Sequence, residues 1–283
     1  MLLAGASFAL MGVLVKLATQ WFSSNELVFY RSLVALALLP AVVSLRHGPD
    51  GGRRFLGAHT ALHLRRGLVG FLALATFFYA VAHLPLSVAI TLNYSSPLFL
   101  ALLMPWQLDE RPGRAQYVTV FAGFLGVALL LRPWDSAPGD LFAGLVGLAS
   151  GVLAAFAYVH VRRLGRLGEP EWRTVFWFAL VSGIGAALLA SLEGWHAAAA
   201  LDHPGLLLGL GGFATLGQLA MTRAYRKGDT AVVAALAYST VVFGSVLDAL
   251  IFRMEMPLTG WAGMLITVLA GIRAVQLTRR RGP

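Results

Sequence analysis

The chain has 283 residues, of which 58% are hydrophobic and 12% are charged, with a formal net charge of +9 and no cysteine. A mean hydropathy of +0.74 excludes a water-soluble globular protein and predicts an integral membrane protein. The lack of cysteine excludes disulfides and thiolate metal ligands. The basic residues are spread over short loops, which argues against a nucleic-acid partner.

Apolar segments long enough to cross a bilayer about 30 Å thick follow one another along the chain. Barrel strands would alternate polar and apolar residues, and these segments do not. We therefore predict an all-α integral membrane protein with ten transmembrane helices, at residues 1–20, 25–45, 63–82, 86–105, 114–132, 139–160, 172–192, 204–224, 230–251 and 257–278. The 1–20 segment has neither a basic leader nor a small-residue cleavage site, so we expect it to be a retained span.

The first two expected helices each contain a charged residue, Lys16 in 1–20 and Arg31 in 25–45. A charge at the centre of a bilayer costs about 3 kcal/mol even on insertion scales, so such residues are usually paired or functional. Both lie in the outer halves of their helices, as does Asp248 in 230–251. We expect the three to pair around an outer gate. The alternative is a gating or coupling role, such as binding a substrate carboxylate as it leaves.

The 86–105 helix carries the richest polar cluster, with Asn93, Tyr94 and Ser95 near its middle. Pro97 follows, and because proline cannot donate a backbone hydrogen bond it frees the carbonyl of Asn93. The pattern predicts a kink at this point. The corresponding position in the 230–251 helix is Val241, so we expect the two helices to differ in function.

Small residues predict close helix packing further along the chain. They recur at every fourth position of the 139–160 helix and at two positions of the 204–224 helix, namely Gly139, Ala143, Gly147, Gly151, Gly205 and Gly209. Such spacing lets two helix backbones approach each other in a membrane. We interpret these faces as packing seams.

Polar side chains within apolar spans are costly unless they face protein or water. The candidates for substrate binding are Tyr79, Asn93, Tyr94, Ser95, Gln218 and Tyr238. The alternative role is hydrogen bonding between helices, which we favour for a single Ser or Thr and weigh about evenly for most of the others. Asp248 is the only acid well inside a span and is the leading candidate to carry a coupling proton, with His83 as the alternative.

Charge in the connections predicts the orientation. Every second connection and the C-terminal tail hold most of the 22 Arg and Lys residues, Arg65 and Arg66 among them, whereas the opposite connections hold only Arg132 and Arg253. Because Arg and Lys concentrate on the cytoplasmic side of short loops, both termini are expected in the cytoplasm.

The segment at 86–110 recurs at 230–255, which indicates an internal duplication. The matched pairs are Val88 and Val232, Leu92 and Leu236, Tyr94 and Tyr238, Ser95 and Ser239, Phe99 and Phe243, Leu103 and Leu247, Glu110 and Glu255, Pro112 and Pro257, and Gly126 and Gly271. Five helices per half is an odd number, so the halves must insert with opposite orientations. We predict two inverted repeats, at 1–134 and 135–283, as in many secondary transporters.

A helix with an aromatic-Ser-Ser/Thr motif, followed by Glu and a glycine-bearing helix, occurs twice and resembles the EamA branch of the drug/metabolite transporter superfamily. Lys16 and Arg31 are similar to basic positions of that family. The resemblance covers nearly the whole chain. It implies export of small metabolites through a cavity lined by the helices at 1–20, 63–82, 86–105, 139–160, 204–224 and 230–251. Within the branch, the aromatic-rich interior resembles bacterial aromatic amino acid exporters.

The predicted function is a secondary transporter that exports small metabolites by alternating access, above all aromatic or other bulky neutral amino acids and related amphiphiles. We expect it in the bacterial inner membrane, with a small-molecule substrate and the lipid bilayer as its partners and with no cofactor or metal. A monomer is compatible with the sequence. No G-x-x-x-x-G-K-[ST] occurs, which disfavours a self-contained ATP-driven pump.

Two other functions were weighed. A sugar-phosphate or nucleotide-sugar exchanger of the same superfamily would need several basic residues near the bilayer centre, and none is expected there. An intramembrane enzyme would need clustered His and carboxylate side chains, whereas the 7 His and 13 acids are dispersed. We therefore do not expect an enzyme.

Overall fold

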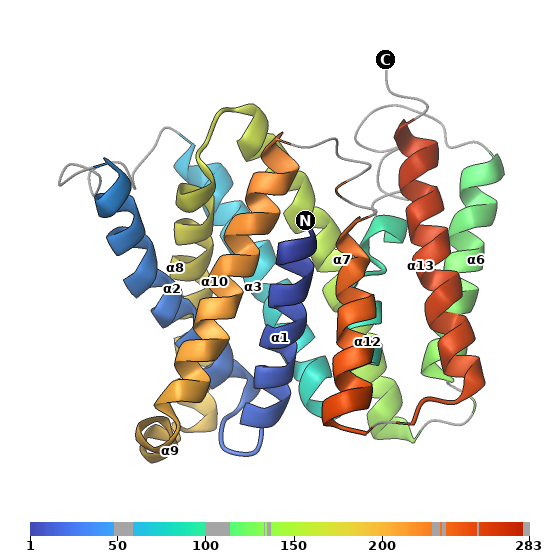
Figure 1. Ribbon diagram of the computed structural model, residues 1–283, viewed down its shortest axis with the longest axis horizontal. Helices are drawn as coiled ribbons and strands as arrows, with labels where there is room; N and C mark the ends of the chain where they lie inside the picture. Colours follow the sequence, from blue (N-terminus) through green and yellow to red (C-terminus); the bar gives the residue numbers. More distant parts are fainter. Residues whose placement is uncertain are drawn as a thin grey trace.

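The computed structural model describes residues 1–47, 59–99, 114–132, 134, 137–227, 233, 236–253 and 255–279, and the regular elements among them are all helical (Figure 1). They are α1 (Leu2–Ala18), α2 (Ser24–His47), α3 (Thr60–His83), α4 (Leu86–Asn93), α6 (Arg114–Leu131), α7 (Pro138–Arg166), α8 (Glu171–Glu193), α9 (Ala197–Asp202), α10 (Pro204–Lys227), α12 (Ser239–Ile251) and α13 (Leu258–Arg279). The all-α class is confirmed. The ten spans and the inverted repeat stay predictions, and the repeat positions Leu103, Glu110, Pro112 and Val232 lie outside the described residues.

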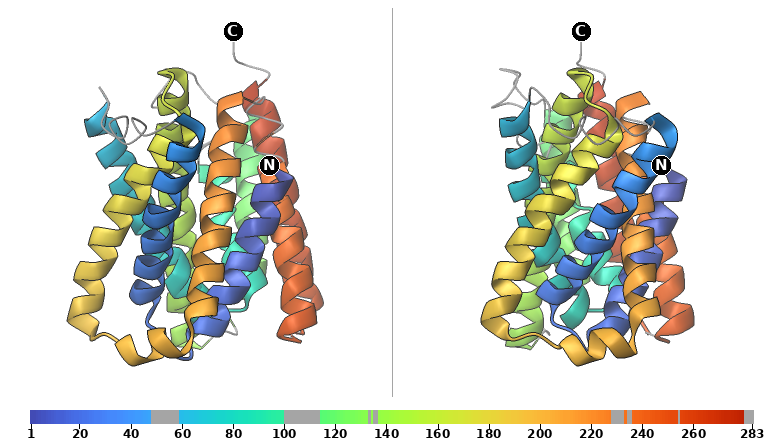
Figure 2. Two further views of the ribbon diagram at one scale, coloured as in Figure 1. Left: turned by 60° about the vertical axis from the view of Figure 1, so that its left-hand side comes forward. Right: turned by 90° about the vertical axis from the view of Figure 1, so that its left-hand side faces the viewer.

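The long helices run side by side along one direction, as expected for a membrane bundle (Figures 1 and 2). Among the described residues, α3, α7, α8 and α10 have both the length and the apolar composition to cross a membrane, and shorter apolar helices occupy 2–18, 117–131, 239–251 and 258–274. Large apolar side chains are exposed on the outside of the bundle, such as Leu188, Leu192, Leu208, Leu250 and Leu265. Such a surface suits contact with lipid.

Helix packing divides the described part of the chain into a main bundle and a peripheral pair. In the main bundle α3 packs against α7 and α8, α2 against α8 and α10, and α1 against α10 and α12. The peripheral pair is α6 and α13, on the right in Figure 1. A Cβ atom on Gly126 would lie 2.8 Å from the Gly263 carbonyl oxygen, so these two backbones meet without side chains between them.

The break in α4 lies where proline predicts it. The helix ends at Asn93, a turn at Tyr94 and Ser95 follows, and residues 96–99 are helical again. Ser95 N donates to the Leu92 carbonyl oxygen at 3.2 Å, a tighter turn than the α-helical pattern. The kink expected from Pro97 is therefore confirmed. A matching turn at Tyr238 precedes α12, although Val241 stands where the first half has Pro97.

A capping box begins α2. Ser23 N donates to Glu26 Oε2 at 2.8 Å, and Glu26 N donates back to Ser23 Oγ at 3.3 Å. The fully buried Glu26 carboxylate also accepts a hydrogen bond from His196 N at 2.6 Å. His196 precedes α9, a short helix that sequence patterns did not predict and that lies across one end of the bundle (Figure 2). We call this end the α9 end.

A second buried carboxylate lies at the end of the bundle opposite α9, where it joins two helices. Glu169, between α7 and α8, accepts a hydrogen bond from Arg173 Nη1 at 2.7 Å and lies 2.9 Å from His59 Nδ1 and 3.4 Å from His63 Nε2. Burial alone would raise the pKa of Glu169, but the hydrogen bonds from His59 and Arg173 outweigh it and hold the pKa below its ordinary value. The cluster ties the start of α3 to the start of α8.

Candidate functional site

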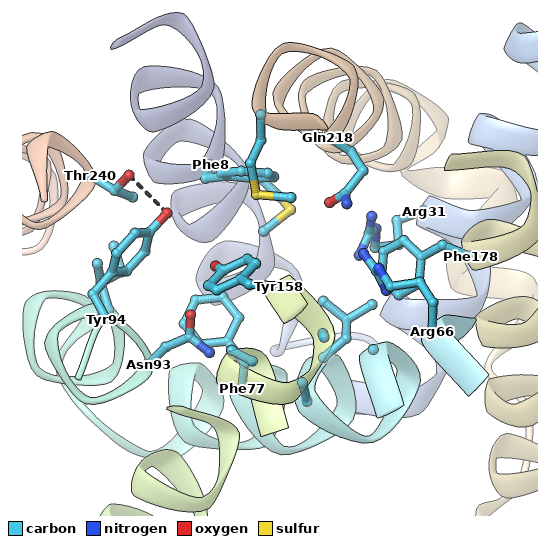
Figure 3. Close-up of a pocket in the computed structure, with 18 residues that line it drawn as sticks. Phe8, Arg31, Arg66, Phe77, Asn93, Tyr94, Tyr158, Phe178, Gln218 and Thr240 are labelled. Carbon is cyan, nitrogen blue, oxygen red and sulfur yellow. Dashed lines mark hydrogen bonds between the residues drawn. The ribbon is translucent and has the colours of Figure 1, made fainter. Parts of the chain in front are cut away.

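A cavity of about 100 Å³ lies inside the main bundle (Figure 3). The six helices named by the family resemblance, α1, α3, α4, α7, α10 and α12, all contribute to its wall, joined by α2 and α8. Its polar lining consists of Arg31, Arg66, Asn93, Tyr94, Tyr158, Gln218 and Thr240. Pockets for drug-sized ligands usually have about 300 to 1,000 Å³. A ligand of that size would therefore need side chains or helices to move.

The break in α4 positions two of the predicted residues on the cavity wall. Tyr94 Oη accepts a hydrogen bond from Thr240 Oγ1 of α12 at 2.9 Å. Asn93 Nδ2 donates to Ser150 Oγ of α7 at 3.0 Å. Gln218, from α10, also lines the cavity, and its Nε2 is buried without a partner among the described residues. Three of the six candidates thus meet in one cavity.

The other three candidates lie outside that wall. Ser95 is buried and its Oγ donates to the Leu92 carbonyl oxygen at 2.6 Å, which closes the turn in α4. Tyr238 stands 6.4 Å from Tyr94 between ring centroids, with its hydroxyl against Gly271, where a side chain would collide with it. A larger residue at position 271 would therefore force the Tyr238 side chain to move.

Tyr79 and His83 line a separate cavity of about 810 Å³ at the α9 end. Their rings stack with centroids 4.1 Å apart, and His83 Nδ1 lies 2.8 Å from the Tyr79 carbonyl oxygen. Glu193 and Asn25 face the same cavity and are joined by a 2.7 Å hydrogen bond. This second cavity lies between the bundle interior and the predicted outer surface.

The expected trio of charges is split in the structure. Lys16 Nζ donates to the Leu84 carbonyl oxygen at 2.5 Å, and Asp248 Oδ2 accepts from Ser87 N at 2.9 Å and from Ser87 Oγ at 2.6 Å. Both charges therefore bond to the chain at the start of α4, where Asp248 caps the helix from a distant part of the sequence. Arg31 is not with them and lines the central cavity, so the grouping of all three was wrong.

Arg66 is a site residue that sequence patterns missed. The charge count assigned it to a connection although it falls at the start of the expected 63–82 helix. The observed α3 begins at Thr60, so Arg66 lies more than one turn inside the helix, with 3% of its surface exposed. Arg31 is 5% exposed at the same cavity. We call these two residues the arginine pair. A second buried basic residue beside Arg31 was not predicted from the sequence.

An aromatic ring partly offsets the free-energy cost of burying the arginine pair. The Arg66 Cζ atom lies 4.2 Å from the ring centroid of Phe178, and the Arg31 Cζ atom lies 5.3 Å from it. Burying each charge costs about 3 kcal/mol on insertion scales, and a desolvated cation–π contact returns about 2 kcal/mol. Contact with the Phe178 ring therefore does not offset the free-energy cost of burying both guanidinium groups.

Aromatic side chains cover much of the remaining wall. Tyr158 of α7 projects into the cavity near Phe8 and Phe77 (Figure 3). Its ring also stacks on Tyr225 of α10 with centroids 5.6 Å apart. Nothing in the sequence distinguished Tyr158 from other aromatic residues of apolar helices. The cavity thus combines a cationic part with an aromatic part.

The model of the EamA-like transporter family matches residues 1–132 and 141–274. The chain belongs to the EamA-like transporter family. It is 34% identical over 271 residues to the pseudopaline exporter CntI of Pseudomonas aeruginosa, covering 94% of this chain and 91% of that protein. It is 26% identical over 268 residues to the riboflavin transporter of Brucella anthropi, covering 91% of this chain and 92% of that protein.

A crystal structure of a protein matches the fold with a TM-score of 0.65 and 18% sequence identity, covering 99% of this chain and 96% of that one. This EamA-like chain is accordingly an integral membrane protein and a transporter of small metabolites, as the family resemblance implied. The named substrates of these two relatives are not amino acids, so the finer likeness to aromatic amino acid exporters is not supported by them.

Proposed function

We propose that this transporter exports a small organic metabolite across the bacterial inner membrane by alternating access through the central cavity. The cavity is the observation that carries the proposal. Its wall combines residues from both expected halves of the chain, as in Tyr94 of α4 bonded to Thr240 of α12. Substrate sites of inverted-repeat transporters lie where the halves meet.

The wall chemistry supports a substrate that has a bulky or aromatic body and a polar head group. Aromatic amino acids have both, and they remain our first candidates. The relatives named for pseudopaline and riboflavin add two compounds to test. The arginine pair favours, as a second candidate, a phosphate-bearing substrate of the sugar-phosphate or nucleotide-sugar type.

A side chain that fills the cavity should block transport. Ala154 of α7 lines the cavity, and the Ala154→Phe variant is expected to lower efflux at least tenfold. Efflux would be measured from proteoliposomes with a panel of phenylalanine, tryptophan, alanine, riboflavin and pseudopaline. The matched control is Ala149→Phe, because Ala149 is exposed on the same helix. Equal efflux by both variants, with the protein folded, would contradict transport through this cavity.

The orientation can be tested independently of substrate. Because the basic connections are expected in the cytoplasm, a fluorescent-protein fusion after the C-terminus should be bright and an alkaline phosphatase fusion inactive. A fusion in the connection after Arg132 should give the opposite pattern. An active phosphatase at the C-terminus would contradict the predicted orientation.

A further inference from the structure

The arginine pair has unused hydrogen-bonding capacity. Nε of Arg31 and both Nε and Nη1 of Arg66 are buried and have no hydrogen-bond partner among the described residues. A guanidinium carries five N–H donors, and buried donors are nearly always satisfied. The two groups lie side by side at one part of the cavity wall, across from Gln218 (Figure 3).

The buried acids that the structure describes are engaged elsewhere. Glu26 pairs with His196, Glu169 with Arg173, and Asp248 bonds to Ser87. Within the described part of the chain, neither member of the arginine pair makes an ion pair. Two like charges therefore share a site without a counter-charge, and an anion that entered would be attracted by both.

The surroundings hold the pair in place and leave its donors free. The Phe178 ring borders both guanidinium groups, and it offers their N–H donors no hydrogen-bond acceptor from a polar side chain. Arg66 folds back over Gly70 of its own helix, where a Cβ atom would collide with Arg66 Nη1 and lie 2.9 Å from Phe178 Cε2. Glycine at position 70 thus leaves room for the observed position of the Arg66 side chain.

We propose that the arginine pair binds the oxyanion of the exported metabolite, a carboxylate or a phosphate, while Phe8, Phe77 and Tyr158 contact its organic part. Arginine matches both oxyanions because its planar fork donates two parallel hydrogen bonds. This inference rests on the proposed export function and adds the charge of the substrate to it. A carboxylate corresponds to an amino acid or organic acid, and a phosphate corresponds to the sugar-phosphate type.

Binding to the purified full-length protein in detergent tests the pair without requiring transport. Three probes share one aromatic body: 3-phenylpropionate, phenyl phosphate and the neutral 3-phenylpropanamide. At least one anion is expected to bind tenfold or more tightly than the amide in a calorimetric or thermal-shift titration, and the better anion identifies the oxyanion. Arg31→Gln and Arg66→Gln should each reduce that preference at least tenfold. Arg65→Gln should leave it unchanged, because Arg65 is exposed beside Arg66.

Thermal stability without ligand separates a binding role from a structural one. Because the pair lacks a counter-charge, Arg66→Gln is expected to unfold at the wild-type temperature or above it, as is common for binding-site residues. The inference would be overturned if the wild-type protein bound the amide as tightly as both anions, or if both glutamine variants kept the full anion preference. Anion binding without efflux of any panel compound would count against the export function alone.

Discussion

Replacing Asp248 with alanine is expected to destabilise the protein by about 1 to 3 kcal/mol, the usual cost of leaving buried hydrogen-bond donors without their acceptor. Its carboxylate accepts two hydrogen bonds from Ser87 at the start of α4, and Lys16 bonds to the same stretch of chain. Without Asp248, the buried N–H and O–H groups of Ser87 lose their hydrogen-bond acceptor. The measurement is the unfolding temperature in detergent. The control is Asp140→Ala, because Asp140 is exposed at the α9 end.

Asp248→Asn distinguishes the capping role from proton coupling. Asparagine keeps one acceptor oxygen but loses the charge, so the capping role predicts a partial loss of stability with efflux preserved for each folded molecule. If Asp248 carries a coupling proton, the same variant should instead lose gradient-driven accumulation and keep downhill flux. Wild-type transport that ignores a pH gradient would reject proton coupling.

Gly151→Ala is expected to damage both stability and transport. A Cβ atom on Gly151 would lie 2.7 Å from the Leu92 carbonyl oxygen and 2.8 Å from Ser95 Oγ, at the break in α4. Overpacking of this kind costs about 1 to 3 kcal/mol. The backbone that must move carries Asn93 and Tyr94 into the cavity, so efflux should fall about tenfold or more as well.

Gly139 supplies the matched control for this substitution. It lies on the same helix and on the predicted glycine seam, but a Cβ atom there would meet nothing within 4 Å. Gly139→Ala should therefore keep wild-type efflux and unfold at the same temperature or slightly above it, since alanine favours helix by up to about 1 kcal/mol over glycine. Equal effects of the two substitutions would show that the break in α4 tolerates displacement.

Sequence patterns predicted the parts of this structure that depend on local chemistry. Apolar length located the long helices among those described, Pro97 located the break in α4, and mid-helix polarity selected Asn93, Tyr94 and Gln218. The capping box of Ser23 and Glu26 was not predicted, although its spacing is also a local pattern. In each case the residues that decide the outcome are neighbours along the chain.

Features that depend on contacts between distant segments could not be predicted. Asp248 and Ser87 are 161 positions apart, and no periodicity links them. Arg66 follows Arg65 at the polar edge of an apolar segment, so the charge count treated both as residues of a connection. Only the packing of α3 against α8 shows that Arg65 faces outward while Arg66 faces Phe178.

Two buried guanidinium groups would couple a movement of their helices across the membrane to the membrane potential. A unit charge that crosses a membrane potential of 100 mV gains or loses about 2.3 kcal/mol. Arg31 and Arg66 sit on different helices, so any rearrangement that shifts α2 or α3 along the membrane normal moves charge through this field. An anionic ligand would cancel part of that charge. The empty and loaded forms would then respond differently to the potential, and the reorientation of the empty form would be the more strongly voltage-dependent step.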